Sequence, residues 1–195
     1  MRTSIILSTL VMLLAPVGCG GQKESANGSA GAQQAVPAPK IDLHSAVVLD
    51  DLEAIRQHVK AGSDLNVLEP SRASTPLITA AALGRPEAAK MLIEEGADLD
   101  YQNNDGSTAL HTAALFCHVE IVKALLEHGA DKTLKNNTGK TALEIVELPF
   151  DVIKPAYDAL QVALKPAGVV LDYEYLKTTR PKVAEILRTE EKEAE

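Results

Sequence analysis

Aromatic side chains are scarce in this chain of 195 residues, where Trp is absent and the aromatic residues together make up 3%. A hydrophobic core must therefore be built from Leu, Ile, Val and Ala, a composition that suits closely packed helices. Basic residues are also few, because 19 Lys and Arg stand against 27 Asp and Glu, which gives a net charge of −8. Nucleic acids and anionic membrane surfaces attract clustered positive charge, so this balance argues against both as partners. The two cysteines, Cys19 and Cys117, are too few for a disulfide scaffold.

The N-terminus lacks a hydrophobic run long enough to span a bilayer. The apolar run from Ile5 to Leu14 is shorter than the roughly 20 residues that a membrane-spanning helix requires. This run follows Arg2 and precedes a short stretch of small residues. A positive start, a short apolar core and small residues before the cleavage site are typical of a secretory signal peptide.

The junction Gly18-Cys19 resembles a bacterial lipobox, although Pro16 stands where Leu is usual. The resemblance implies a diacylglycerol on the Cys19 thiol, cleavage before Cys19 and acylation of the new amine. An ordinary secretory signal with an incidental cysteine is the alternative. Residues 1–18 are therefore predicted as a lipoprotein signal peptide, and residues 19–40, rich in Gly, Ser, Ala, Gln and Pro, as a flexible tether. The expected location is the bacterial cell envelope, with a lipid-anchored protein that faces the periplasm or the exterior.

An internal repeat with a period of about 33 residues runs through the middle of the sequence. The triplets Thr75-Pro76-Leu77, Thr108-Ala109-Leu110 and Thr141-Ala142-Leu143 follow one another at this period, and Gly96 and Gly129 recur at the same interval. These columns resemble the ankyrin repeat. The unit that matches that pattern best contains Gly106-Ser107-Thr108-Ala109-Leu110-His111, Ala113-Ala114, His118, Ile121-Val122, Leu125-Leu126 and Gly129-Ala130-Asp131.

The residue types at these positions explain the repeat physically. Thr75, Thr108 and Thr141 can each cap a helix, because a hydroxyl accepts a hydrogen bond from an amide of the first turn. Gly96 and Gly129 can end the second helix in the left-handed conformation that glycine adopts at low cost. One helix pair cannot bury its apolar face alone, so the units are expected to stack. The predicted fold is an all-α ankyrin-repeat solenoid of about four helix-pair units with β-turn tips, at residues 41–71, 72–104, 105–137 and, in part, 138–148.

Several positions depart from the family pattern. The first unit starts at Asp42 instead of Thr-Pro and carries His58 where Leu is expected, and polar changes of this kind suit an N-terminal capping repeat. The junction from Leu68 to Arg72 is one residue longer than its counterparts, so its tip should differ in shape. Cys117 replaces the Gly of the turn between the helices, where a left-handed backbone is expected. The pattern breaks at Leu148-Pro149.

Residues 149–195 are predicted as a helical C-terminal cap with an acidic tail. Helical spacing of apolar residues predicts one helix from about Pro155 to Leu164, a short helix with Tyr173 and Leu176, and a last helix after Pro181. Covering the open end of the stack is the first interpretation of this region. A separate recognition surface is the alternative.

No catalytic residue, metal ligand or cofactor site is predicted. Gly139-Lys140-Thr141 resembles the end of a phosphate-binding loop, but the first glycine of that motif is absent. The polar residues at 98, 100 and 102 are spaced like the first ligands of a calcium loop, but the glycine and the final Glu of that loop are absent. Residues 117–120 offer Cys, His and Glu without a second ligand cluster. His111 is expected to hydrogen-bond to Thr108, as in the family, and to be structural.

The resemblance implies a protein-binding module without enzymatic activity, whose partner lies in the groove of first helices and loop tips. Leu83 and Phe116 are one repeat apart in the same column, so stacking should place them side by side. Exposed apolar residues of this kind dominate interfaces, although packing against neighbouring turns is the other interpretation. The candidate partner-binding residues are Leu83, Leu115, Phe116, Asp105, Asn104, Ser107 and Lys140.

Two other functions stay open. The first is a structural lipoprotein that organises the envelope without a specific soluble partner. The second is a ligand-binding or enzymatic site in residues 149–195, where Tyr157, Tyr173 and Tyr175 are the available polar aromatics and no base is paired with them.

Overall fold

The computed structural model describes residues 40–165 and 168–189, which lie in one compact unit of residues 35–195. The signal peptide, nearly all of the tether and the end of the acidic tail, predicted from the sequence, fall outside the described residues. Within the described ranges every regular element is a helix, in agreement with the predicted all-α class.

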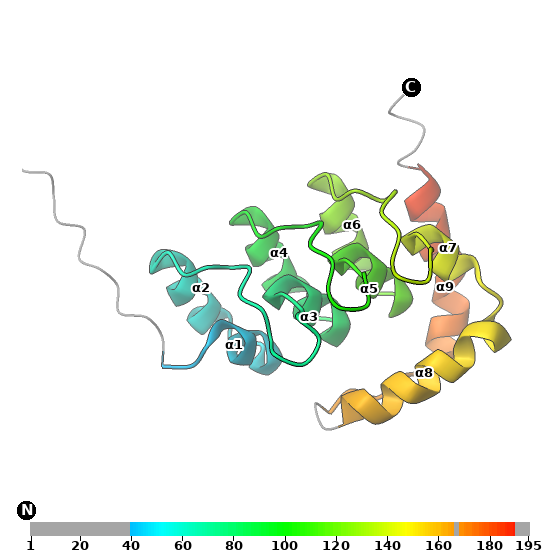
Figure 1. Ribbon diagram of the computed structural model, residues 1–195, viewed down its shortest axis with the longest axis horizontal. Coiled ribbons are helices and arrows are strands. Elements are labelled where there is room, and N and C mark those ends of the chain that lie inside the picture. The colour runs from blue at the N-terminus through cyan, green and yellow to red at the C-terminus, as the bar shows by residue number, and fades with distance from the viewer. Residues whose placement is uncertain (1–39, 166–167, 190–195) are drawn as a thin grey trace, which may run out of the picture. The chain divides into compact units, whose positions relative to one another are not determined.

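Two rows of helices pack against each other (Figure 1). The first row contains α1 (Leu43–Leu49), α3 (Pro76–Leu83), α5 (Ala109–Leu115) and α7 (Ala142–Glu147). The second row contains α2 (Leu52–Lys60), α4 (Pro86–Glu94) and α6 (Val119–Glu127). Each helix contacts its neighbours in its own row, and α1, α3 and α5 also pack against α2, α4 and α6, respectively. This ladder of contacts is the predicted stack of helix pairs.

Side-chain caps begin the first-row helices, as the sequence predicts. The Oγ1 atoms of Thr75, Thr108 and Thr141 accept hydrogen bonds from the amide three residues further on, at 3.3, 3.3 and 3.2 Å. Asp42 performs the same role for α1, because its carboxylate accepts from the Ser45 amide at 2.9 Å. Each cap satisfies an amide that has no partner within its own helix.

Left-handed glycines close the turns between units. Gly96 and Gly129, which follow α4 and α6, both have φ of 84°. At the tip of the third unit, Gly106 has φ of 69°, and a methyl group there would lie 2.5 Å from the Asn137 side chain. The next tip packs directly on this one, because the Asn137 amide donates to the Asp105 carbonyl at 3.0 Å. Glycine is therefore required at position 106 both by its backbone and by its neighbour.

An insertion splits the fourth helix pair. The long helix α9 (Tyr173–Thr189) contacts α7 and α6, so it takes the second-row position next to α7. Its sequence Arg180-Pro181, followed by buried Val183, Ala184 and Leu187, repeats Arg85-Pro86, followed by buried Ala88, Ala89 and Leu92. The second half of α9 is thus the second helix of a fourth unit. Residues 149–179, which include α8 (Phe150–Leu164), are inserted between its two helices.

Two prolines lie inside helices where the sequence predicted helix starts. The helix expected from Pro155 begins at Phe150, and the two helices expected around Pro181 form one continuous α9. A proline inside a helix removes the hydrogen bond to the carbonyl four residues earlier. Those carbonyls belong to Asp151 and Lys177, which are exposed, so water can replace the missing donors.

Candidate functional site

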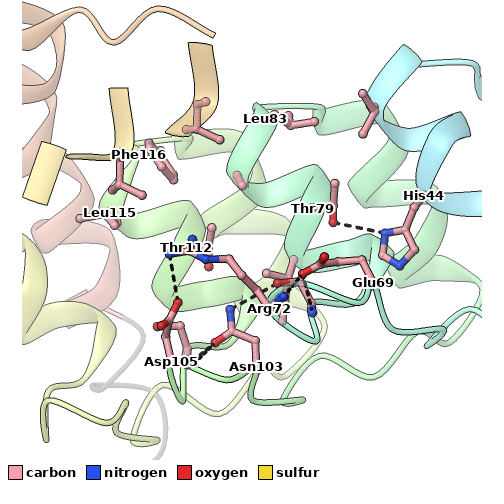
Figure 2. A pocket seen from close by; sticks show the side chains of 17 residues that line it. His44, Glu69, Arg72, Thr79, Leu83, Asn103, Asp105, Thr112, Leu115 and Phe116 are labelled. Carbon is pink, nitrogen blue, oxygen red and sulfur yellow. Dashed lines mark hydrogen bonds and ion pairs between the residues drawn. The ribbon is translucent and has the colours of Figure 1, made fainter. Parts of the chain in front are cut away.

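A pocket of about 410 Å³ opens on the first-row face of the stack, between α1, α3, α5 and the far end of α8 (Figure 2). Its walls come from four helices and from the tips of the second and third units. One end of the pocket is apolar, and its main residues are Leu83, Leu115, Phe116, Leu160 and Leu164. The other end is polar and contains Glu69, Arg72, Asn103, Asp105 and Ser107.

The apolar residues predicted for this site differ in how much of them a partner could reach. Leu83 and Leu115 are half-buried, whereas Phe116 is only 5% exposed and stacks on His118 with ring centroids 6.0 Å apart. Most of the Phe116 surface is therefore already used in packing. Leu83 and Leu115 offer the larger apolar contact to a partner.

The polar end is organised by charged groups at two neighbouring tips. Arg72 and Asp105 form an ion pair across the tips, with Nη2 and Oδ2 3.5 Å apart (Figure 2). The Glu69 carboxylate accepts from the amides of Ser71 and Arg72 at 2.8 and 2.6 Å. Burial opposes the charge on Glu69, but these bonds, with that from the Ser71 hydroxyl, lower its pKa to about 2. The longer junction that the sequence shows here is thus a tip folded around one carboxylate.

Five of the seven predicted contact residues line this pocket. Asp105 and Ser107 lie at its polar end with the three apolar residues at the other end. Asn104 lies beside the pocket, where its amide donates to the Arg72 carbonyl at 2.9 Å. Lys140 is further along the stack, and its carbonyl is bonded to His111 Nε2 at 3.0 Å.

His111 has the structural role that the sequence predicts. The Thr108 amide donates to its Nδ1 at 3.3 Å, so Nδ1 is the acceptor and Nε2 carries the proton. Nε2 then donates to the Lys140 carbonyl, which ties the third unit to the fourth. Burial lowers the pKa of His111, because the charged imidazolium would lose water without gaining an anionic partner.

The sequence did not predict the two pocket residues that α8 contributes. Leu160 and Leu164 of the insertion line the pocket together with Leu115 and Phe116. The spacing of these leucines predicts an apolar helix face, but nothing in the neighbouring sequence indicates which surface that face covers. Another unpredicted wall residue is His44 of α1, whose Nε2 lies 2.9 Å from the Val67 carbonyl.

A buried polar cluster holds α8 against the repeats. The Tyr157 hydroxyl, on a side chain with 0% exposure, donates to the Leu115 carbonyl at 2.6 Å. Arg180 is 4% exposed and donates to the Tyr157 hydroxyl at 2.9 Å and to the carbonyls of Ile145 and Leu148 at 2.9 and 2.7 Å. Burial raises the pKa of Tyr157 to about 12, so this phenol stays protonated and acts as a structural link.

Cys117 is a buried structural thiol at the base of the same region. Its φ of 58° is left-handed, as the sequence predicts for a position where the family has Gly. Burial raises the pKa of the thiol to about 11, which leaves almost no thiolate near neutral pH. In the described part of the chain, His, Cys, Asp and Glu form no group of three that could hold a metal ion. No helix among the described residues has both the length and the apolarity needed to cross a bilayer.

The capped helix pairs and their linked tips define an all-helical ankyrin repeat array, which confirms the fold predicted from the sequence. Residues 43–136 match the family described as ankyrin repeats in three copies. Among solved structures, the ankyrin repeat domain of Bcl-3, described as a unique member of the IkappaB protein family, aligns with a TM-score of 0.52 at 30% identity. That alignment covers 53% of this chain and 45% of the Bcl-3 chain.

Curated relatives share a shorter stretch. Protein phosphatase 1 regulatory subunit 27 of Homo sapiens and of Mus musculus is 39% identical to this chain over 70 residues. The match covers 36% of this chain and 45% of each relative, so the chain spans less than half of their length. At the level that these comparisons support, residues 43–136 form an array of ankyrin repeats.

Proposed function

We propose that this protein is a non-enzymatic adaptor that holds a protein partner in the pocket between the first-row helices, the tips and α8. One observation carries the proposal: an apolar end with half-exposed Leu83 and Leu115 lies next to a charged end with Arg72 and Asp105. An apolar anchor beside a polar rim is the arrangement that protein interfaces use. The bound segment presents one bulky apolar side chain next to polar groups.

The test is affinity capture from membrane extracts with three versions of the chain. Leu83→Ala removes an apolar wall of the pocket and should weaken capture of a specific partner by about tenfold or more. Leu49→Ala is the matched control, because Leu49 is 68% exposed on α1 and does not line the pocket. Equal capture by both variants would reject the pocket as the binding site. The absence of any specific partner would favour the structural, envelope-organising alternative.

We further propose that acyl chains on Cys19 tether the array to a bacterial envelope membrane. The support is the Gly18-Cys19 junction after a short apolar run, followed by a stretch rich in Gly, Ser and Pro before the first helix. If Cys19 is acylated, the chain should partition into membranes and detergent, because each buried methylene contributes about 0.8 kcal/mol. The variant Cys19→Ala should stay uncleaved or become soluble. Mature protein in the aqueous fraction with an unmodified Cys19 would contradict the anchor.

A second candidate function is binding to a protein phosphatase catalytic subunit. The 39% identity over 70 residues to protein phosphatase 1 regulatory subunit 27 favours it. Isothermal titration of purified protein phosphatase 1 catalytic subunit into the chain tests this candidate directly. If Leu83→Ala weakens the binding, the phosphatase subunit is the partner that the pocket holds. If the titration shows no binding, the phosphatase subunit is excluded as a partner.

A further inference from the structure

We propose that a basic cavity at the C-terminal end of the array binds a short acidic segment of a partner protein through the carboxylates of that segment. The cavity has a volume of about 490 Å³ and is lined by the end of α7, the start of α8 and one side of α9, which packs beside α7 (Figure 1). It shares no residue with the pocket on the first-row face. The proposal therefore does not depend on the function proposed for that pocket.

Positive charge gathers in this cavity, although the chain as a whole has a net charge of −8. Three cations of α9 line it, Lys177, Arg180 and Arg188, and helical periodicity places them on one side of that helix. The one carboxylate of the cavity belongs to Glu147, which forms an ion pair with Arg188. Lys177 and Arg180 have no ion-pair partner among the described residues. Two positive charges in one cavity are thus left without an anion.

Arg180 is the unusual member of this set, because its charge is buried among neutral groups. The residue is only 4% exposed. Its Nη1 donates to the Tyr157 hydroxyl and its Nη2 to the carbonyls of Ile145 and Leu148, whereas its Nε has no acceptor among the described residues. Buried charges in proteins are normally paired with an opposite charge. An anion bound in the cavity supplies the countercharge that α7 and α8 do not provide.

The spacing of the cations favours an extended peptide over a compact anion. Lys177 and Arg188 are 11 residues apart in α9, which corresponds to about 16 Å along the helix, so one phosphate group cannot contact both. A strand of about five residues covers this length with its side chains. The rest of the cavity is lined by apolar side chains, those of Val146, Leu148, Phe150, Pro181 and Ala184. The expected ligand is therefore a segment in which carboxylates flank apolar side chains.

The acidic residues that follow α9 in this chain cannot fill the whole site. Residues 190–195 contain four Glu and continue directly from Thr189. Lys177 lies about 18 Å back along α9 from Thr189. Six extended residues span at most about 22 Å, and a reversal of direction uses about four of them. A segment of another protein is the occupant that can contact both Lys177 and Arg188.

A nucleic acid fits this cavity less well than an acidic peptide. Binding to a phosphate backbone needs several cations along an extended surface, and the net charge of −8 repels a polyanion. The cavity offers two uncompensated cations and an apolar wall. That combination matches a few carboxylates and apolar side chains.

The test is a nuclear magnetic resonance titration of the isotopically labelled full chain with the peptide acetyl-Glu-Leu-Glu-Leu-Glu-amide. We expect a dissociation constant of about 0.1–1 mM and a shift of the Arg180 Nε–H resonance. The same peptide with Gln in place of each Glu should bind at least about tenfold more weakly. Raising the salt concentration should also weaken binding, because the contacts are between charges.

Matched substitutions locate the peptide in the cavity. Lys177→Gln should weaken binding about three- to tenfold. Lys182→Gln is the control, because Lys182 is an exposed lysine of the same helix that does not line the cavity, and it should leave binding unchanged. Glu147→Gln releases Arg188 from its ion pair and should strengthen binding about threefold or more. These variants leave the buried Arg180 and its hydrogen bonds in place.

Four results would overturn the proposal. Resonances that do not move at peptide concentrations up to about 5 mM would mean that no such site exists. Equal binding to Lys177→Gln and Lys182→Gln would place the peptide elsewhere. An oligothymidylate of five nucleotides that binds more tightly than the peptide would make the site one for nucleic acid. If changing the four Glu of residues 190–195 to Gln moves the Arg180 Nε–H resonance of the free chain, those residues are the occupant.

Discussion

Cys117 occupies a position with two opposing requirements. Its left-handed φ of 58° is unfavourable for any residue except Gly, Asn and Asp, by roughly 1–2 kcal/mol. Its side chain is nevertheless fully buried, and its Sγ lies 3.8 Å from the Leu176 carbonyl of α9. The corresponding position of the second unit is Gly84, with φ of 64°, where the neighbour is a His118 ring and no space for a side chain exists. A cysteine is tolerated at 117 because α9 leaves room for it and buries it.

Replacing Cys117 by Gly should therefore change stability little. The variant relieves about 1 kcal/mol of backbone strain and loses a similar amount through glycine entropy and lost burial. We expect the free energy of unfolding in urea to stay within about 1 kcal/mol of the parent value. Cys117→Val should lose about 2 kcal/mol or more, because a β-branched residue at positive φ is strained. A loss above about 2 kcal/mol in the glycine variant would show that packing of the thiol dominates.

Arg85 and Arg180 occupy equivalent positions before Pro86 and Pro181, but their surroundings differ. Arg85 is half-buried; its Nη1 is 3.8 Å from an Asp50 carboxylate oxygen, and its Nη2 donates to the Val48 carbonyl at 3.3 Å. Arg180 is buried, and its partners are neutral: one phenol and two backbone carbonyls. The insertion that covers Arg180 has turned a half-buried position into an internal link between α7, α8 and α9.

The two arginines should therefore respond differently to the same substitution. Arg180→Met leaves buried carbonyls without donors and should lower the free energy of unfolding by about 2–4 kcal/mol. Arg85→Met removes a partly exposed ion pair and one long hydrogen bond to the Val48 carbonyl, and should cost about 1 kcal/mol. Urea unfolding of both variants measures the difference. Equal losses would mean that the Arg180 cluster adds no stability beyond that of a partly exposed contact.

Helix α8 and helix α9 have separate structural roles, although they follow each other in the chain. The second half of α9 completes the fourth helix pair and buries Val183, Ala184 and Leu187. Helix α8 is bonded to the repeats through the Tyr157 hydroxyl and lines the pocket with Leu160 and Leu164. Closing the stack is thus the task of α9, whereas α8 forms one wall of the pocket.

Two deletions distinguish these roles. Removing residues 149–195 exposes Ile145 and Val146 of α7, which are buried in the intact chain, and should cause aggregation or loss of cooperative unfolding. Replacing residues 148–179 by Ala-Leu-Gly restores the connection that Ala82, Leu83 and Gly84 make in the second unit and keeps Arg180 and the helix that follows. This variant should stay monomeric and unfold cooperatively, with a lower midpoint. Light scattering and thermal unfolding provide the measurements, and an array that is equally stable after the longer deletion would contradict the role of α9.

Across the whole array, successive units are joined by hydrogen bonds between tips. The Asn104 amide donates to the Arg72 carbonyl at 2.9 Å, and the Asn137 amide donates to the Asp105 carbonyl at 3.0 Å. His111 adds a side-chain link to the fourth unit through the Lys140 carbonyl. Because these links bridge neighbouring units, they help the stack to unfold as a whole.

The buried His111 predicts a loss of stability in acid. Burial lowers its pKa in the folded chain below the ordinary value of 6.5, so the unfolded chain binds the proton more readily. The contribution is fully present above about pH 6.5 and decreases as the pH falls below that value. Urea unfolding at pH 7.5 and at pH 5.5 should show a smaller difference for His111→Gln than for the parent chain. An equal difference would mean that His111 does not contribute to the pH dependence.

Local features of the fold could be predicted because they depend on neighbouring residues. The threonine caps, Asp42 at the start of α1 and the left-handed backbone at Cys117 each follow from residue type and spacing within one unit. The apolar pocket residues Leu83, Leu115 and Phe116 were also predicted as neighbours, because the period of the repeat sets which positions stack.

The arrangement of residues 149–189 was decided by contacts between distant segments. A second Arg-Pro pair followed by buried positions was present in the sequence, but the inserted residues 149–179 separated it from α7 and broke the period. Only packing shows that α9 completes the fourth unit, because its partners α6 and α7 are far away in the chain. The same is true of Leu160 and Leu164, whose helical spacing indicates an apolar face without indicating its target. Tyr157 holds that face over the pocket, because its buried hydroxyl donates to the carbonyl of Leu115, a pocket residue, and Arg180 fixes the same hydroxyl from the side of α9.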